Sequence, residues 1–396
     1  MKTAGIIAEY NPFHNGHAYH IERTREAGAE AVICVMSGSF VQRGEPAVMT
    51  ARARAQMALK NGADLVISLP LPWACAGAQT FARGAVSLLN ATGCTDILSF
   101  GSECGDTKLL RSAALAVDGY AVRESLRSNL MLGMGFASAR QNALEDISPE
   151  IARVLSNPND TLAVEYIRAL ALSGSSIEPL AVLREGAGHD SDVVCADSAS
   201  ASLIRSMLKN GEDVSRLMPR SAYEILSAEI SAERVPADIA RLETAVLARL
   251  RLMSAKELSE VPDMSEGLEN RIYSATRTAS SLEELYSLAK TKRYSHSRIR
   301  RAVMNAFLGV SAKDCEGEPP YIRVIGFGGR GRELLRTMRE SASLPVVMRA
   351  ADVSRLSERA KHIFELEAAA VDIFALSLPK ALACGAEYTN EIVIAD

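Results

Sequence analysis

Residues 4–20 read Ala-Gly-Ile-Ile-Ala-Glu-Tyr-Asn-Pro-Phe-His-Asn-Gly-His-Ala-Tyr-His. The apolar residues 4–8 predict a buried strand, the Asn-Pro and Asn-Gly pairs predict a turn, and residues 18–27 predict a helix. The motif His14-Asn-Gly16-His17 therefore falls where a strand passes into a helix N-terminus, whose free N–H groups and dipole favour an anion. Gly16 lets that anion approach closely. The pattern predicts a phosphate site in which His14 and His17 are catalytic, donating to phosphate oxygens during displacement at phosphorus.

Zinc is the alternative ligand for these histidines. The usual pair of helical zinc ligands is spaced i, i+4, and a glycine between the first two histidines suits a nucleotide better than a metal. We therefore assign no metal ligand. His20 lies one helical turn beyond the motif, and we expect it to be a packed or hydrogen-bonded histidine.

The composition bounds the class of protein. The chain has 396 residues, of which 48% are hydrophobic, enough for two or three domains of about 150 residues each. It shows no secretory signal and no membrane-spanning stretch, and its seven cysteines form no Cys-x-x-Cys pair, so we expect a cytoplasmic chain with reduced thiols. The net charge of −4 argues against general electrostatic binding of nucleic acid but allows a local basic face.

Further apolar runs alternate with helical patterns. Runs without regular alternation of polar residues, separated by helices, indicate a parallel sheet covered on both faces. We therefore expect a doubly wound α/β domain with its ligands at the carboxyl ends of the strands. The expected strands after the first are 31–36, 64–69, 96–100 and 180–183.

The pattern changes near residue 206. We expect residues 1–205 to form the α/β domain and residues 206–396 to form a mainly helical C-terminal domain with one small βαβ-like unit at about 321–348. That unit holds a Gly-x-Gly-x-x-Gly motif at Gly326, Gly328 and Gly331, with Asp352 further on, which is a dinucleotide pattern. With no further strands to build a sheet and four arginines on its helix, we expect no dinucleotide there.

Two more segments carry chemistry. Ser200, Ser202 and Arg205 stand at an expected helix start, where hydroxyls cap free N–H groups and an arginine one turn later reaches a phosphate. Residues 292–301 hold five basic residues and no acidic one. Ile299 and Val303 share one helical face and Arg298 and Arg301 another. A solvated basic face and a contact with phosphate backbone are both open.

Together these segments resemble the His-Ile-Gly-His class of nucleotidyltransferases and, more closely, the tRNA(Met) cytidine acetate ligase family. The chain departs from the usual family pattern at Ser39, Ala51 and Asp160. The resemblance covers nearly the whole chain. Its segments are Gly5–His17, Ser37–Ala47, Asn61–Val66, Phe100–Glu103, Pro158–Asn159, Ser200–Arg205, Glu266–Asn270 and Lys292–Arg298.

The resemblance implies a nucleotidyltransferase-like catalytic domain at 1–205 that activates acetate with ATP. The acetyl-adenylate then acetylates N4 of the wobble cytidine of elongator tRNA(Met). Acetate is itself the nucleophile, Mg²⁺ is expected to bridge phosphates, and residues 37–47 are a candidate shield for the intermediate. The implied ATP-binding residues are Ile7, Asn11, Phe13, His14, Gly16, His17, His20, Gly101, Asn159, Arg184, Ser200, Ser202 and Arg205.

We expect Lys292, Arg293, Arg298 and Arg301 to contact the tRNA. No membrane and no protein partner is predicted. Two other functions are considered. A small-molecule adenylyltransferase of cofactor biosynthesis would need only one domain, whereas this chain adds nearly 200 mainly helical residues. An RNA-binding or scaffolding protein with a vestigial site would have degraded phosphate motifs, and these motifs are intact.

Overall fold

One mixed sheet organises the chain in the computed structural model, which describes residues 1–184 and 197–395. Within these residues eight strands pair in the order β10-β8-β5-β2-β1-β6-β7, with β9 beside β8. The chain moves outward from β1 to β2 and β5, then returns to β6 and β7 on the other side of β1, so the strand order reverses between β1 and β6. The parallel strands are β1 (Thr3–Ala8), β2 (Ala31–Ser37), β5 (Leu65–Leu69), β6 (Ile97–Ser102) and β7 (Glu178–Leu183).

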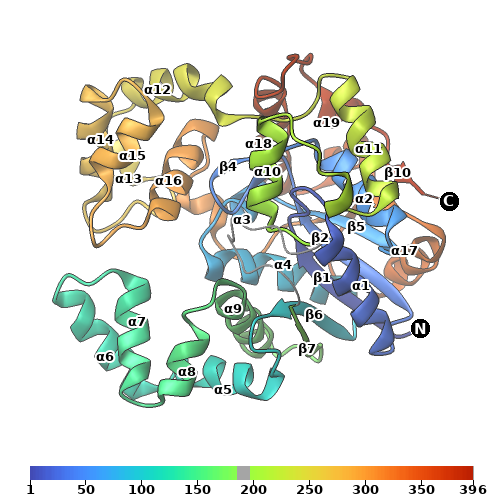
Figure 1. Cartoon of the computed structure of the whole chain (residues 1–396), viewed down its shortest axis with the longest axis horizontal. Coiled ribbons are helices and arrows are strands. Elements are labelled where there is room, and N and C mark those ends of the chain that lie inside the picture. Colours follow the sequence, from blue (N-terminus) through green and yellow to red (C-terminus); the bar gives the residue numbers. More distant parts are fainter. Residues whose placement is uncertain (185–196, 396) are drawn as a thin grey trace.

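All five expected strands are confirmed, and helices cover both faces of the sheet (Figure 1). Ile33 and Val35 point into one core and Val32 and Cys34 into the other, because side chains alternate along a strand. The first face carries α4 (Ala78–Thr92), α5 (Thr107–Val117), α9 (Pro158–Leu172), α17 (Gly329–Ser341) and α18 (Glu358–Ala375). The second carries α1 (Asn15–Glu26), α2 (Ala51–Lys60), α10 (Ala201–Lys209) and α11 (Arg220–Ser231).

The first helix begins three residues earlier than the sequence predicts. Helix α1 starts at Asn15, and His14 is its N-cap. The Nδ1 atom of His14 accepts a hydrogen bond from the backbone N–H of Gly16 at 3.1 Å. An imidazole nitrogen thus does the work usually done by a serine or aspartate oxygen, which a search for ordinary cap residues does not detect.

The expected βαβ unit exists, but the prediction that it has no sheet to build on is wrong. Strand β8 (Ile322–Phe327) pairs antiparallel with β5, and β9 (Val346–Val347) and β10 (Val393–Ile394) pair parallel with β8. Since β8 runs against β5, the glycine-rich turn after it lies at the amino ends of the parallel strands. This is the edge opposite to the one that follows β1.

Two helical groups stand out from the sheet on the same side (Figure 1). The arm consists of α5 with α6 (Tyr120–Met131), α7 (Phe136–Glu145) and α8 (Pro149–Val154). The lobe consists of α12 (Glu243–Leu252), α13 (Ala255–Ser259), α14 (Leu268–Thr278), α15 (Leu282–Ala289) and α16 (His296–Leu308). They meet where a Cβ added to Gly135 would lie 2.9 Å from the Lys292 carbonyl oxygen.

Shorter elements complete the chain. Strands β3 (Phe40–Val41) and β4 (Glu45–Pro46) form a hairpin within segment 37–47. The hairpin packs closely on α16, because a Cβ added to Gly44 would lie 2.5 Å from the backbone nitrogen of Arg301. No helix in the described ranges is long and apolar enough to cross a membrane. The remaining helices are α3 (Leu71–Ala74), α19 (Ala386–Thr389), η1 (Ser215–Leu217), η2 (Ile239–Leu242), η3 (Ala312–Cys315) and η4 (Ala350–Arg355).

Candidate active site

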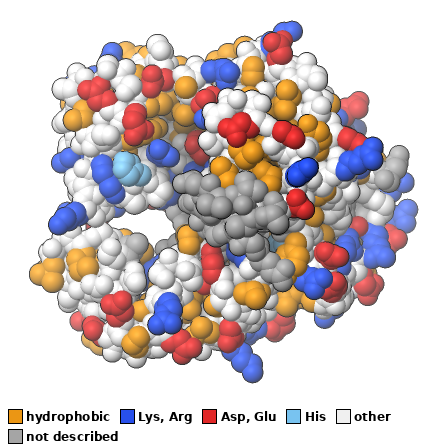
Figure 2. Space-filling model, viewed as in Figure 1, with side chains coloured by type: hydrophobic (Ala, Val, Ile, Leu, Met, Phe, Trp, Pro, Cys, Tyr) orange, Lys and Arg blue, Asp and Glu red, His pale blue; other side chains and the backbone are white. Residues whose placement is uncertain are grey.

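A cavity of about 1340 Å³ opens at the carboxyl edge of the parallel strands. Its walls come from the turn after β1, the β3–β4 hairpin, α9, the start of α10, the arm and the lobe. Figure 2 shows it as an opening between the two outlying helical groups. It lies where the strand order reverses, which is the usual ligand position in a doubly wound sheet.

The two catalytic candidates, His14 and His17, lie together in this cavity. Their rings stack with 3.8 Å between centroids. The Nδ1 atom of His14 accepts from the Gly16 N–H, and the Nδ1 atom of His17 accepts from the His14 N–H at 3.2 Å. A nitrogen that accepts carries no proton, so this hydrogen-bond assignment places the ring proton of each neutral imidazole on Nε2. Each ring therefore offers one N–H donor.

Burial keeps these imidazoles neutral. It lowers the pKa of His14 to about 3, and the positive charges of Arg184 and Arg205 contribute in the same direction. Burial is also the main reason that the pKa of His17 lies well below its usual value, with His14 and Arg184 adding to the effect. At neutral pH the pair acts through N–H dipoles, not as cations.

Two buried aromatic side chains pack against the ring of His17. Phe13 is fully buried with its ring centroid 5.5 Å from that of His17, and Tyr10 packs edge-on against His17 at 4.9 Å. The expectation that Phe13 binds ATP stays a prediction, and its side chain is not among those that line the cavity. It belongs to the apolar core and holds the His17 ring in place.

His20 is hydrogen-bonded, as predicted. Its Nε2 atom lies 3.0 Å from the Ser99 hydroxyl, which in turn lies 2.7 Å from the Thr24 hydroxyl. Burial lowers the pKa of His20 to about 4. The ring also lines the cavity, and it ties α1 to β6 on the two sides of the strand-order reversal.

The second motif meets the first. Ser200 caps α10 by accepting from the Leu203 N–H at 3.1 Å. Arg205 donates to the Asn11 carbonyl at 2.9 Å, and its second terminal nitrogen lies 3.3 Å from the Ser202 hydroxyl. The Asn11 side-chain oxygen accepts from the Val48 N–H, whereas its buried Nδ2 has no partner among the described residues. The two motifs, nearly 200 residues apart in sequence, thus form one wall of the cavity. The Asn11 Nδ2 atom in this wall is a hydrogen-bond donor without a partner in the described part of the chain.

Three more of the implied ATP-binding residues, Gly101, Asn159 and Arg184, also lie on the cavity. A Cβ added to Gly101 would lie 3.3 Å from the Arg184 side chain, so these two residues are neighbours. Asn159 donates its side-chain N–H to the Glu103 carboxylate at 2.6 Å. Asp160, where the sequence departs from the family pattern, accepts from the Ser102 hydroxyl and the Glu103 N–H. It is therefore part of the scaffold beneath Asn159.

Sequence reasoning missed two residues at this site. Arg54 is fully buried and donates to the carbonyl oxygens of Glu9 at 2.6 Å and Ser37 at 3.0 Å, which joins the ends of β1 and β2. Burial lowers its pKa to about 10. Glu9, directly after β1, lines the cavity. The available signal was the position of Glu9, a carboxylate directly after a buried strand, at the edge of the sheet where ligands are expected.

Two arginines of the basic segment have acidic partners from elsewhere in the chain. No acidic residue lies within 292–301 itself, but Arg298 pairs with Glu266 at 2.9 Å and Arg301 pairs with Asp263 at 2.9 Å. Those partners come from a loop more than 30 residues earlier in the sequence, beyond the reach of a local pattern. Lys292 and Arg293 are exposed and also line the cavity. Ile299 and Val303 are buried as predicted.

The described residues hold no group of three or more His, Cys, Asp or Glu side chains that could bind a metal ion. Four of the five described carboxylates on the cavity are paired with arginines. The residues present therefore do not form a protein cage for Mg²⁺, and no step below passes through one. The zinc alternative finds no support in the described part of the chain either.

This fold and site are those of a nucleotidyltransferase, and a profile of the family described as HIGH Nucleotidyl Transferase matches residues 1–387. Curated relatives named tRNA(Met) cytidine acetate ligase include one from Acetivibrio thermocellus, 38% identical over 100% of both chains, and one from Caldicellulosiruptor saccharolyticus, 42% identical over 86% of each. The chain belongs to the tRNA(Met) cytidine acetate ligase family.

Solved structures agree with this assignment. The apo form of Thermotoga maritima TmcAL is 32% identical, with a TM-score of 0.95 and coverage of 100% of this chain and 99% of that one. A second form of the same protein, bound with alpha-thio ATP, is 33% identical with a TM-score of 0.93. Both match the whole chain, including the arm and the lobe.

Proposed function

We propose that this chain joins acetate to the wobble cytidine of elongator tRNA(Met), using ATP. The supporting observation is the wall formed by His14, His17 and Arg205, whose donors converge on a cavity at the strand-order reversal. Membership of the tRNA(Met) cytidine acetate ligase family and likeness to a structure bound with alpha-thio ATP support the same reaction. Because its substrates are tRNA and ATP, we expect the reaction to take place in the cytoplasm.

In the first step an acetate oxygen attacks the α-phosphorus of ATP and pyrophosphate leaves. No enzyme nucleophile is needed, so the protein acts by holding the reactants in line and stabilising charge. His14 and His17 donate Nε2–H bonds to the phosphate oxygens, and Gly16 leaves room for them. Arg205, with Ser200 and Ser202, takes the triphosphate.

The rest of the nucleotide contacts come from the neighbouring strand ends. Ile7, Asn11, His20, Gly101, Asn159 and Arg184 line the same cavity. We assign Gly101 and Asn159 to adenosine and Arg184 to the nucleotide. Phe13 contributes only from beneath, through His17. Any Mg²⁺ that the reaction requires would be held by the phosphates of ATP, and titration of activity against magnesium would test whether the reaction requires it.

We assign tRNA contact to the lobe, within the 206–396 portion of the chain, and catalysis to residues 1–205. Lys292 and Arg293 are two exposed cations of the lobe that line the cavity, while Arg298 and Arg301 hold the loop at 263–266 that shapes the same wall. Figure 2 shows Lys and Arg side chains gathered on the edge of the lobe that faces the opening. An anticodon loop seated there would bring its bases to the cavity.

The test is nucleoside mass spectrometry of tRNA(Met) transcript incubated with the protein, ATP and acetate. N4-acetylcytidine at the wobble position is the expected product, and its formation should stop when either acetate or ATP is omitted. Propionate in place of acetate measures how strictly the acyl pocket selects its substrate. Acetate-dependent exchange of pyrophosphate into ATP without any acetylated tRNA would instead support a small-molecule adenylyltransferase. No structural observation favours that alternative.

A further inference from the structure

The second half of the proposed reaction needs a base. The exocyclic amine of cytidine attacks the acetyl carbonyl of acetyl-adenylate, and the nitrogen must lose a proton as the amide forms. A side chain that accepts this proton has to reach the cavity, be unprotonated at working pH and be free of a stronger partner. These three requirements discriminate among the side chains that line the cavity.

Five carboxylates among the described residues line the cavity, and four of them are held by arginines. An arginine at hydrogen-bond distance occupies the carboxylate oxygens that a general base needs for the incoming proton. The pairs are Asp118 with Arg168 at 2.7 Å, Glu165 with Arg140 at 2.6 Å, Asp263 with Arg301 at 2.9 Å, and Glu266 with Arg298 at 2.9 Å.

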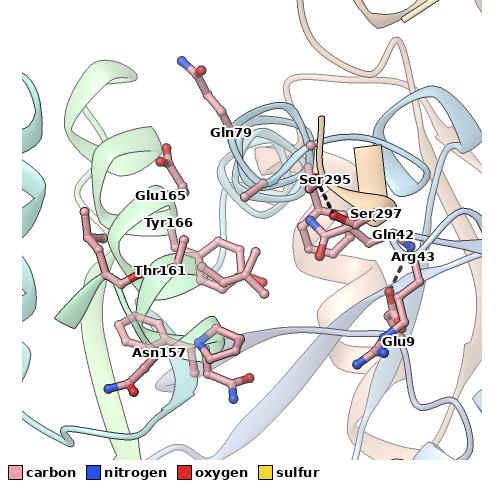
Figure 3. Close-up of a pocket in the computed structure, with 18 of the residues that line it drawn as sticks. Glu9, Gln42, Arg43, Gln79, Asn157, Thr161, Glu165, Tyr166, Ser295 and Ser297 are labelled. Atoms are coloured by element: carbon pink, nitrogen blue, oxygen red, sulfur yellow. Dashed lines mark hydrogen bonds between the residues drawn. The ribbon is translucent and has the colours of Figure 1, made fainter. Parts of the chain in front are cut away.

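Glu9 is the exception among them. In the described part of the chain it makes no ion pair, and its Oε1 atom accepts one hydrogen bond, from the Gln42 backbone N–H at 3.0 Å. Figure 3 shows Glu9 beside Gln42 and Arg43 on one wall, with Thr161 of α9 and its N-cap residue Asn157 on the other. It directly follows β1, five residues before His14, and lines the same cavity as the two catalytic candidates.

The histidines of the cavity are poorly suited to the same task. The Nδ1 atoms of His14 and His17 already accept backbone N–H bonds, and the Nε2 atom of His20 is engaged with Ser99. Burial lowers all three pKa values, to about 3 for His14 and about 4 for His20. Weakly basic imidazoles donate well to phosphate but take up protons poorly.

Resting on the function proposed above, we propose that Glu9 is the general base for acetyl transfer. One Glu9 carboxylate oxygen takes the proton from the N4 amine as nitrogen bonds to the acetyl carbon. The bond between that carbon and the adenylate oxygen then breaks, and AMP leaves with the electron pair. Glu9 afterwards returns the proton to solvent. In the first half-reaction no proton has to be removed from acetate, so Glu9 has no part there.

The surroundings of Glu9 suit this role. Burial raises its pKa, which makes it a stronger base than an exposed carboxylate, while the Gln42 N–H and the charges of Arg205, Arg43 and Arg54 work against that rise by favouring the ionised form. The negative charge of Glu9 also contributes to raising the pKa values of Tyr166 and Cys75. Both of those stay protonated at working pH.

The test is Glu9→Gln, which keeps the shape and an oxygen to accept from Gln42. Acetate-dependent pyrophosphate exchange should stay within about threefold of wild type, whereas single-turnover transfer from preformed acetyl-adenylate to tRNA should fall about 10²–10⁴-fold. Affinity for tRNA, measured by filter binding, should not change. Asp118→Asn is the matched control, since it removes another cavity carboxylate. It should leave the ratio of the two half-reaction rates as in wild type.

A second measurement needs no variant. The wild-type rate of single-turnover transfer should decline as the pH falls through the raised pKa of Glu9, while exchange stays level over the same range. Equal loss of both half-reactions in Glu9→Gln, or undiminished transfer, would overturn the proposal. So would single-turnover transfer whose rate stays as level with pH as the rate of exchange. Absence of both half-reactions in wild type would instead refute the proposed function itself.

Discussion

The backbone N–H of His14 donates to the Nδ1 atom of His17 at 3.2 Å, and the two imidazole rings lie stacked with 3.8 Å between centroids. Each histidine therefore fixes the tautomer or the position of the other. Because one unit presents both Nε2–H donors, the two side chains should not contribute independently to catalysis.

We expect His14→Ala or His17→Ala to fold and to lose about 10²–10³ in the rate of adenylation, the usual cost of removing a transition-state donor. The double variant should lose little more than either single one. The measurement is acetate-dependent pyrophosphate exchange. His362→Ala, which removes an exposed histidine paired with Asp314, is the control. Near wild-type exchange in a folded double variant would remove the pair from the mechanism.

The neutral histidines also predict how stability depends on pH. Their pKa values are lowered in the folded chain, to about 3 for His14 and about 4 for His20, so the unfolded chain binds protons that the folded chain does not. The free energy of unfolding should therefore fall as pH drops below about 6.5, by up to about 1.4 kcal/mol per pH unit for each histidine. Urea unfolding at pH 7, 6 and 5 measures this. In His14→Asn/His17→Asn the decline should be shallower, and an unchanged slope would contradict the assignment.

The strand pattern and the histidine motif could be predicted because both signals are local. Five apolar runs at the right spacing define the parallel part of the sheet, and the motif follows the first of them. The start of α1 was missed because a histidine serves as its N-cap. The pairing of β8 with β5 was missed because nothing in residues 322–327 shows which strand they join. Such choices depend on the rest of the folded chain.

The Gly-x-Gly-x-x-Gly pattern at 326–331 is explained by close packing rather than by nucleotide binding. A Cβ added to Gly331 would lie 2.1 Å from the Asp64 carbonyl oxygen, and one added to Gly326 would lie 2.8 Å from a Leu59 methyl group. These glycines allow α17 and β8 to pack closely on β5 and α2. Asp352, the acidic residue of the same pattern, accepts from the Arg349 N–H at η4. The expectation that no dinucleotide binds here remains a prediction, now with packing as its reason.

Gly331→Ala should therefore destabilise the fold by about 1–3 kcal/mol through overpacking. Gly329→Ala is the matched control, because a Cβ there meets nothing within 4 Å and the residue is also helical. Thermal unfolding compares the two variants. In the wild-type protein ATP should raise the midpoint and NAD should not. Equal stability of both variants, or clear stabilisation by NAD, would contradict this interpretation.

The basic segment shows where local reading of charge fails. Residues 292–301 contain no acidic residue, yet Arg298 also donates to the Ser265 hydroxyl at 2.7 Å and to the Asp263 carbonyl at 3.0 Å, and its side chain is only 17% exposed. An arginine with these bonds braces a loop. Lys292 and Arg293, by contrast, are exposed on the cavity side of the lobe.

We therefore expect the two pairs of residues to behave differently on substitution. Lys292→Ala/Arg293→Ala should weaken tRNA binding regardless of sequence and reduce the slope of log affinity against log salt by about 0.7–0.9 for each phosphate that is no longer neutralised. Its thermal midpoint and ATP affinity should not change. Arg298→Ala/Arg301→Ala should lower the midpoint, because the variant lacks two ion pairs to the 263–266 loop. Filter binding over a salt series, with ATP affinity for each variant, separates the outcomes. If tRNA affinity and salt slope are unaltered in Lys292→Ala/Arg293→Ala, these residues are a solvated surface and the tRNA site lies elsewhere.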